Sequence, residues 1–294
     1  MGYLVLTLSY FLYGLSDAVG PLAFRMGSDS TTLAFFNCAL PLPFIAATMV
    51  ATRVGFRIDR RALFASSALG IFAGLTALTL NGSYVFNGAG IGTTLHMSHT
   101  LVASFGEAAL ERRRPRVGTL VALVFVLCGV GVFSLVGERF AGSAVGIALA
   151  LLSGLTYGMV ALLAGHSAAR RAPAFQAQFY AFLFATATLA IYTLATRGYV
   201  APSLPARAWG VHFFCAITTN YAAFALVCLG MRRVGSTAGS IMGALEPIFC
   251  AVFSVFILAE RFTPANILGC ALILIGVVIE PLCAAATKTA AGPR

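Results

Sequence analysis

Uninterrupted apolar segments of about 20 residues constrain the fold of this chain more than any other feature. One of them, from Val234 to Leu258, carries Glu246 as its single charged residue. A helix of roughly 20 residues crosses a hydrocarbon core of about 30 Å. Because the segments recur along the chain and do not alternate between polar and apolar residues, they predict membrane-spanning α-helices rather than the strands of a barrel.

Composition supports the same class of protein. Hydrophobic residues make up 60% of the chain and charged residues 10%, against about a quarter charged in soluble domains. The net charge of +10 comes from short connections between apolar segments. The one basic cluster, ERRRPR (111–116), contains no aromatic residues, so we interpret it as a topology signal and expect a lipid bilayer, not nucleic acid, as the partner.

Cysteine and lysine usage excludes several chemistries. The seven cysteines lie in or beside apolar segments without any C-x-x-C pair, so neither a zinc site nor a disulfide framework is expected. The single lysine, Lys288, lies near the C-terminus, which excludes a Schiff-base pigment within the membrane. No cofactor is expected. The first apolar segment starts at Tyr3 without a basic flank and is interpreted as a retained span.

Ten candidate helices follow from the apolar segments, and together they predict an all-α polytopic membrane protein. They cover residues 3–24, 31–53, 62–85, 90–110, 117–136, 144–164, 175–196, 207–231, 235–259 and 264–284. If the N-terminus is cytoplasmic, most of the 19 Lys and Arg residues fall on the cytoplasmic side. The positive-inside rule therefore favours cytoplasmic N- and C-termini in a bacterial-type cytoplasmic (inner) membrane.

The two halves of the chain resemble each other. ERRRP (111–115) follows the fourth candidate helix and ERFTP (260–264) follows the ninth. YGLSDAVGPLAF (13–24) in the first helix also echoes SGLTYGMVALLA (153–164) in the sixth. Each half then holds five spans. Because five is an odd number, the second half enters the membrane from the side opposite to the one where the first half begins. This inverted-repeat plan around a central cavity is typical of secondary transporters.

The segment GSTAGSIMGALEPIFCAVFSVFILAERFTPANILGCALILIGVVIE (235–280) resembles the EamA type of the drug/metabolite transporter superfamily. The resemblance rests on its small-residue start, its E-P pair, its E-R pair followed by proline, and its Gly-containing last span. It implies ten helices around a central cavity and alternating access. The implied domains are a first five-helix repeat at 1–140 and a second at 141–286, followed by a disordered tail at 287–294.

Two carboxylates inside apolar segments are the sharpest candidates for a substrate site. Glu246 precedes Pro247, which is expected to bend the helix beside protein or water. Tyr10, Tyr13 and Asp17 share one helix face, which suits an amine-bearing ligand. Alternatively, Glu246 is a structural residue of the fold, and Asp17 lies in interfacial water beside an aromatic belt.

Other polar residues predict that the cavity is lined with hydrogen-bonding groups. His96 and His99 share a helix face and could line a pore or exchange protons, or they could be packed neutral rings. A third zinc ligand is not found near them. The remaining candidates are Asn81, Tyr84, Tyr157, Asn220 and Tyr221. Each of these could instead join helices to one another.

These observations favour a secondary transporter, an exporter of small amine-bearing or neutral polar metabolites such as amino acids. No Arg or Lys lies mid-span to pair with a strongly anionic substrate, and no Walker-type motif indicates ATP as the driver. Proton coupling is possible. The alternatives are transport of drug-like cations or nucleosides, a channel, or an intramembrane enzyme, although no filter or hydrolase motif is found. We therefore expect a non-enzyme.

Overall fold

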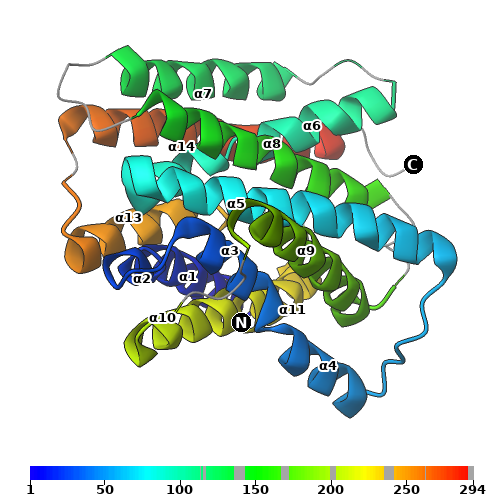
Figure 1. Cartoon of the computed structure of the whole chain (residues 1–294). Helices are drawn as coiled ribbons and strands as arrows, with labels where there is room; N and C mark the ends of the chain where they lie inside the picture. The colour runs from blue at the N-terminus through cyan, green and yellow to red at the C-terminus, as the bar shows by residue number, and fades with distance from the viewer. Residues whose placement is uncertain are drawn as a thin grey trace.

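The computed structural model describes residues 1–112, 114, 117–135, 143–166, 172–198, 203–234, 242–261 and 263–290. In these residues all regular structure is helical, and the helices form one bundle (Figure 1). Five segments are long and apolar enough to cross a membrane: Ser30–Ala51, Arg60–Leu110, Ala144–Ala164, Ala174–Arg197 and Ala206–Gly230. Val117–Gly129, Leu245–Leu258 and Ile267–Gly276 are shorter apolar helices. The chain is therefore a multi-pass membrane protein.

Helices of the first half are interrupted where the sequence places proline or glycine. Their bounds are α1 (Gly2–Val19), α2 (Leu22–Arg25), α3 (Ser30–Ala39), α4 (Leu42–Ala51), α5 (Arg60–His96), α6 (His99–Leu110) and α7 (Val117–Leu135). Pro21 and Pro41 stand immediately before α2 and α4, where a missing N–H leaves no bond unmade. Asp29 begins α3 by accepting hydrogen bonds from the Thr31 and Thr32 N–H groups.

The long helix α5 is two antiparallel helices joined at Gly88. Gly88 has φ 74° and ψ 166°, outside the helical region. The hydroxyl oxygens of Tyr84 and Thr93 lie 3.0 Å apart, whereas nine residues of straight helix would separate them by about 14 Å along the axis. The chain therefore reverses at Gly88, at the boundary predicted between residues 62–85 and 90–110. Glu260 stabilises the reversal by accepting a hydrogen bond of 2.9 Å from the Ala89 N–H.

The second half consists of longer α-helices and one short π-helix, in which the helix is locally wider. Its elements are α8 (Ala144–His166), α9 (Ala174–Arg197), α10 (Ala206–Ile217), the π-helix η2 (Thr218–Ala223), α11 (Phe224–Val234), α13 (Leu245–Leu258) and α14 (Pro264–Ala290). α9 ends at Gly198 in the left-handed conformation, φ 74°, which glycine adopts without steric cost. α10, η2 and α11 continue one another in the chain.

Two expectations about the second half require correction. Pro247 does not bend the interior of a helix, because α13 begins at Leu245 and the proline lies in its first turn. The Gly243 carbonyl instead accepts a hydrogen bond from the Glu246 N–H at 3.1 Å. The tail expected to be disordered from residue 287 is helical up to Ala290, since alanine, the best helix former, dominates this end. Residues 291–294 lie outside the described residues.

Helix pairs in the bundle join the two halves of the chain. α1 packs against α13 and α11, while α8 packs against α5 and α6. α9 packs against α5, α10 against α3, and α7 against α14. Figure 1 shows α5 crossing the middle of the molecule, with α7 on one side and α10 on the other. The first and second halves are therefore intertwined rather than separate.

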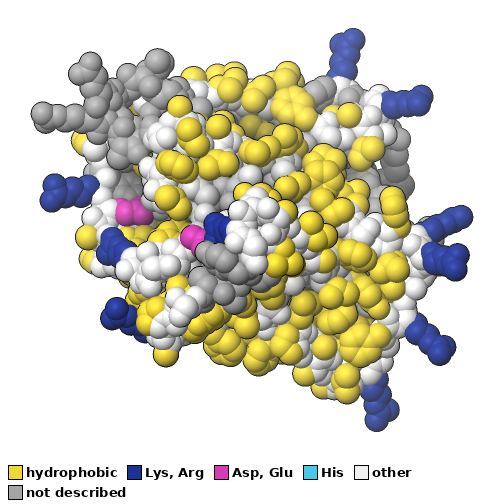
Figure 2. Space-filling view, viewed as in Figure 1, with side chains coloured by type: hydrophobic (Ala, Val, Ile, Leu, Met, Phe, Trp, Pro, Cys, Tyr) yellow, Lys and Arg dark blue, Asp and Glu magenta, His cyan; other side chains and the backbone are white. Residues whose placement is uncertain are grey.

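The outer surface is apolar and the interior holds many hydroxyls. Phe256 is 81% exposed and Phe64 77%, whereas Ser9, Ser66 and Thr93 are fully buried. Figure 2 shows hydrophobic side chains across the middle of the visible face, with Lys and Arg side chains projecting at its left and right ends. This distribution suits a hydrocarbon environment between two charged interfaces, where small polar residues join helices to one another.

Candidate functional site

Asp17 lies inside the bundle and is held by hydroxyl groups from α5. Thr93 Oγ1 donates to Asp17 Oδ2 at 3.4 Å, and the Tyr84 hydroxyl lies 3.0 Å from Thr93 Oγ1. Thr93 Oγ1 also lies 3.5 Å from Cys250 Sγ on α13. Asp17 is therefore held at a junction of three helices, α1, α5 and α13.

α13 packs against α1, the helix that carries Tyr10, Tyr13 and Asp17, and Glu246 stands in the first turn of α13, near enough to Asp17 for their charges to interact. Its side chain is only partly buried. Among the described residues, its carboxylate makes no hydrogen bond or ion pair with a side chain. Two carboxylates from opposite ends of the sequence thus lie within electrostatic range inside the bundle.

Gly14 allows α1 to approach α13 closely enough for this arrangement. A Cβ at residue 14 would lie 2.7 Å from the Glu246 carbonyl oxygen and 2.7 Å from Phe249 Cβ, distances that no side chain tolerates. Gly14 falls on the same helix as Tyr10 and Asp17. On α8, Gly154 makes a similar close approach, since its Cβ would lie 3.1 Å from the His96 carbonyl oxygen.

The two histidines form an aromatic cluster with Tyr157. The ring centroids of His96 and His99 lie 5.2 Å and 4.8 Å from that of Tyr157, and 5.1 Å from each other. His96 Nδ1 lies 2.9 Å from Ser153 Oγ, and His99 Nδ1 lies 3.0 Å from the His96 carbonyl oxygen. Tyr157 remains 41% exposed, so the cluster is not fully enclosed on the side of this tyrosine.

Three of the predicted residues make contacts between helices or within one helix and are not joined to the carboxylates or to the histidine–tyrosine cluster. They are Asn81, Asn220 and Tyr221. The Asn81 amide donates to the Ala77 carbonyl oxygen at 2.7 Å within α5. The Asn220 amide donates to the Asn37 carbonyl oxygen at 2.8 Å, and the Tyr221 hydroxyl lies 2.7 Å from Thr48 Oγ1. The contacts of Asn220 and Tyr221 match the interpretation that such residues join helices to one another, whereas the contact of Asn81 stays within its own helix.

Sequence reasoning missed Thr93 and Ser153, which support the predicted residues. Thr93 joins Asp17 to Tyr84, and Ser153 holds His96. A signal was present for Thr93, because it precedes His96 by three positions and so shares a helix face with it. Nothing in the sequence identified Ser153, since its partner lies on another helix.

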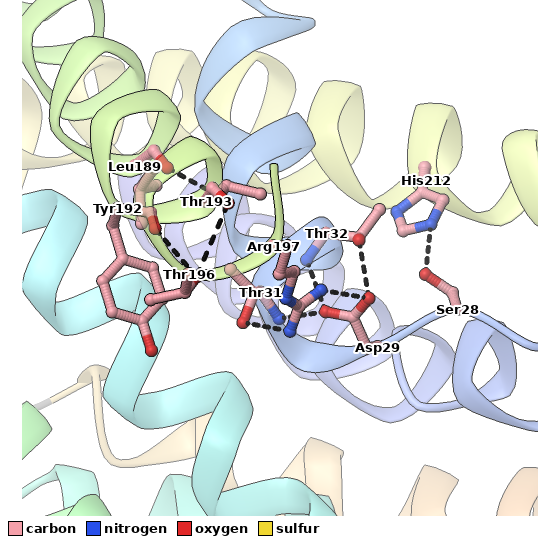
Figure 3. A network of polar contacts seen from close by, with 10 residues as sticks. All are labelled: Ser28, Asp29, Thr31, Thr32, Leu189, Tyr192, Thr193, Thr196, Arg197 and His212. Atoms are coloured by element: carbon pink, nitrogen blue, oxygen red, sulfur yellow. Dashed lines mark hydrogen bonds and ion pairs between the residues drawn. The ribbon is translucent and has the colours of Figure 1, made fainter. Parts of the chain in front are cut away.

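A second polar network links the two halves near the connection between α2 and α3 (Figure 3). Arg197 at the end of α9 forms an ion pair of 2.6 Å with Asp29 and donates to Thr31 Oγ1 at 2.9 Å. Ser28 Oγ lies 2.9 Å from His212 Nε2. Burial by itself would raise the pKa of Asp29, but hydrogen bonds from Arg197 and Thr32 hold it below the ordinary value of 3.8.

Two further features of the described residues bear on metal and small-molecule binding. These residues contain no group of three or more His, Cys, Asp or Glu side chains that could hold a metal ion. A cavity of about 600 Å³ lies between α6, α7 and α8, and its walls include Leu101, Phe105, Leu127 and Met159. This apolar cavity does not include the carboxylates or the tyrosines described above.

The second half of the chain matches a known family of membrane carriers. The model of the EamA-like transporter family aligns with residues 144–279. The match confirms the resemblance recognised in the sequence.

Two transporters of Bacillus subtilis (strain 168), both named as uncharacterized, are similar to this chain. YwfM is 22% identical over 204 residues, which cover 69% of this chain and 68% of YwfM. YcbK is 24% identical over 184 residues, which cover 60% of this chain and 58% of YcbK. One crystal structure, described only as that of a protein, superposes with a TM-score of 0.66 at 17% identity. It covers 96% of this chain and 98% of that chain, so the fold is shared throughout.

Glu246 and Tyr157 fall inside the EamA-like segment, and Tyr10, Tyr13 and Asp17 fall outside it. The candidate site therefore combines residues of the recognised domain with residues of the first half of the chain. The EamA-like segment and the transporters similar to this chain indicate a membrane transporter, and the candidate site draws residues from both halves of the chain.

Proposed function

We propose that this chain is a secondary transporter that exports small amine-bearing or neutral polar metabolites such as amino acids. In the proposed architecture, residues 1–140 and 141–286 form two inverted five-helix repeats around a central site. Substrate binding shifts the equilibrium between states that open to one side of the membrane and to the other. The carrier works in a bacterial-type cytoplasmic membrane, and no ATP-binding motif of the Walker type indicates a direct chemical driver.

The observation that carries this proposal is the meeting of Asp17 and Glu246 within the bundle. Ionisable groups in a hydrocarbon environment are costly, at about 2.5–3.5 kcal/mol on insertion scales. They are therefore retained mostly where a substrate or ion passes. Here the two carboxylates come from different halves of the chain, on α1 and α13, which pack against each other.

The packing of the helices supports the two-repeat architecture. Counted by the predicted spans, the first packs against the ninth as α1 does against α13, and the sixth packs against the fourth as α8 does against α6. Replacing each span of the first pair by the equivalent span of the other half, the first by the sixth and the ninth by the fourth, gives the second pair. The contact of α7 with α14, the fifth and tenth spans, maps onto itself under the same exchange. This pattern is expected of two repeats related by a pseudo-twofold axis.

Counterflow in liposomes tests the proposal. Purified protein is reconstituted with a high internal concentration of a mixture of amino acids and small amines, and uptake of each radiolabelled compound is followed. A carrier shows uptake that saturates and depends on unlabelled compound inside. Uptake that never saturates would indicate a channel and contradict alternating access.

Asp17→Asn provides the residue-level test. This substitution keeps the shape of the side chain and removes its charge, so exchange of an amine substrate should fall at least about tenfold. The protein should still elute as a single species in detergent. Wild-type exchange in this variant would remove Asp17 from the proposed site. A second measurement with a protonophore examines proton coupling, because collapse of the gradient stops only coupled uptake.

A further inference from the structure

We propose that the cavity between α6, α7 and α8 binds an acyl chain of an anionic phospholipid, whose headgroup lies at Arg112 and Arg114. The cavity has a volume of about 600 Å³, and its walls include Val102, Phe105 and Leu127. It lies apart from the candidate substrate site, so this inference concerns a second site on the molecule and does not rest on the proposed function.

Close packing of α6 on α8 forms the floor of the cavity. The two helices meet through successive pairs four residues apart: Ser98 with Gly154, Val102 with Gly158, and Gly106 with Leu162. Because both helices advance together along these pairs, they run parallel, and their last residues, Leu110 and His166, lie on the same side of the membrane. The opposite wall is formed by Leu123 and Leu127 of α7, a helix that packs against α14.

The walls of the cavity suit hydrocarbon better than water. Among the lining residues only Ser98 has a polar side chain, and an ordered water needs two to four polar partners. Leu127 is 60% exposed, so the cavity reaches the apolar outer surface. The twelve helical steps from Ser98 to Leu110 span about 18 Å, and the hydrocarbon of one leaflet is about 15 Å thick. An acyl chain that starts beside Leu110 can therefore extend along the cavity.

Positive charge stands where the headgroup of such a lipid would lie. Arg112 follows the end of α6 by two residues, and the side chains of Arg112 and Arg114 are both exposed. The segment ERRRPR (111–116) contains four arginines and one glutamate, so it keeps a net positive charge. Basic segments next to membrane-spanning helices attract anionic lipids, and basic pockets between such helices bind their headgroups. A negatively charged headgroup is therefore favoured over a zwitterionic one.

Brominated phospholipids test the site, because bromine on an acyl chain quenches the fluorescence of a tryptophan that it contacts. Phe105→Trp places a reporter in the cavity wall, and Trp209→Phe removes the single native tryptophan. The purified double variant is reconstituted into phosphatidylcholine vesicles that contain a minor fraction of brominated phosphatidylglycerol or of brominated phosphatidylcholine with the same chains. We expect the reporter to show at least about fivefold tighter binding of the anionic lipid.

Matched variants separate headgroup recognition from general contact with lipid. Arg112→Gln combined with Arg114→Gln should abolish the preference for phosphatidylglycerol. Arg57→Gln combined with Arg60→Gln removes two exposed arginines from the connection between α4 and α5 and should leave the preference unchanged. In the wild-type protein, Trp209 lies on α10, on the other side of α5 from α7 (Figure 1), and should be quenched equally by the two lipids. High salt should weaken the preference at the reporter, because it screens exposed charges.

Three outcomes would overturn the inference. Equal quenching of the reporter by the two brominated lipids would mean that the cavity only contacts bulk lipid, and no quenching by either would mean that no acyl chain enters it. A preference that survives the loss of Arg112 and Arg114 would place the headgroup elsewhere. If that variant does not fold, a preference that persists at high salt in the parent reporter contradicts the role of the arginines in the same way.

Discussion

At the scale of single residues, Thr93 joins three groups of the candidate site, although it is not among the residues predicted from the sequence. Its hydroxyl lies near the Tyr84 hydroxyl, the Asp17 carboxylate and the Cys250 sulfur at once. Thr93 is fully buried, and a buried polar group without a partner costs about 1–3 kcal/mol. Removing this one oxygen therefore leaves two other polar groups less well satisfied.

Thr93→Val should lower the free energy of unfolding by about 1–3 kcal/mol, because valine keeps the volume and removes the hydroxyl. Unfolding in detergent, followed by circular dichroism, measures the change. Thr93→Ser retains the hydroxyl and serves as the control, with a smaller loss from the missing methyl group. Equal stability of Thr93→Val and wild type would mean that the hydroxyl does not hold Asp17 in place.

At the scale of helices and their junctions, glycines decide where helices turn and how closely they approach. Gly88 reverses the chain between the two parts of α5, with φ 74°. Gly82 lies within the first of these parts, where a Cβ would meet only Leu149 Cδ1 at 3.4 Å. Comparing the two positions therefore distinguishes a glycine that is required for its positive φ, Gly88, from a glycine that lies in a regular helix, Gly82.

Gly88→Ala should destabilise the protein by about 1–2 kcal/mol through its backbone conformation. Its Cβ would also lie 2.5 Å from the Glu260 carboxylate, which adds to this cost. The matched variant Gly82→Ala should be neutral or stabilising, since alanine favours the helix by up to about 1 kcal/mol. Thermal unfolding of both proteins provides the measurement. Similar unfolding temperatures for the two variants would argue against the reversal at Gly88.

The ion pair between Asp29 and Arg197 joins the start of α3 to the end of α9 and should make stability depend on pH. The pKa of Asp29 is lower in the folded protein than its ordinary value of 3.8. Its stabilising contribution is therefore present at pH values above 3.8 and is lost as the pH falls through the folded-state value. Partly exposed pairs contribute about 1 kcal/mol or less.

Arg197→Gln should consequently lower stability by about 1 kcal/mol or less at pH 7, and the difference from wild type should shrink as Asp29 becomes protonated. Urea unfolding at pH 7 and below pH 4 checks both parts. Arg207→Gln, at an exposed position, provides the comparison and should change little at either pH. A difference that stays constant with pH would show that Arg197 stabilises the protein without Asp29.

At the scale of the whole molecule, the apolar belt in Figure 2 separates two ends that carry charge. The topology predicted from arginine placement assigns the connection between α4 and α5 to the cytoplasm and the connection between α9 and α10 to the opposite side. Single cysteines at Gly55 and Ser203, one in each connection, can distinguish these sides.

A membrane-impermeant maleimide applied to intact cells should label Ser203→Cys, whereas Gly55→Cys should react only after the cells are opened. The reason is the bias of arginine toward the cytoplasm, which orients short connections. Wild-type protein provides the background from its native cysteines. Labelling of both variants in intact cells, or the reverse pattern, would show that the predicted orientation is wrong.

Much about this protein follows from its sequence because the membrane is a simple solvent. Hydrocarbon requires each membrane-crossing segment to be apolar and internally hydrogen-bonded. The sequence therefore predicts the helical class and the candidate segments, and it identifies Asp17 and Glu246 as unusual charged residues within them. The EamA resemblance was also recognisable, because the E-P, E-R and proline positions near residues 246–264 lie within one continuous segment.

Tertiary structure decided which polar residues meet. Asp17 and Glu246 are separated by most of the chain, and their proximity depends on the close approach at Gly14. The sequence could not show that Asn220 and Tyr221 are used between helices, or that Thr93 holds Asp17. Periodicity shows which face of a helix a residue occupies, but the neighbour of that face is set by packing between distant segments.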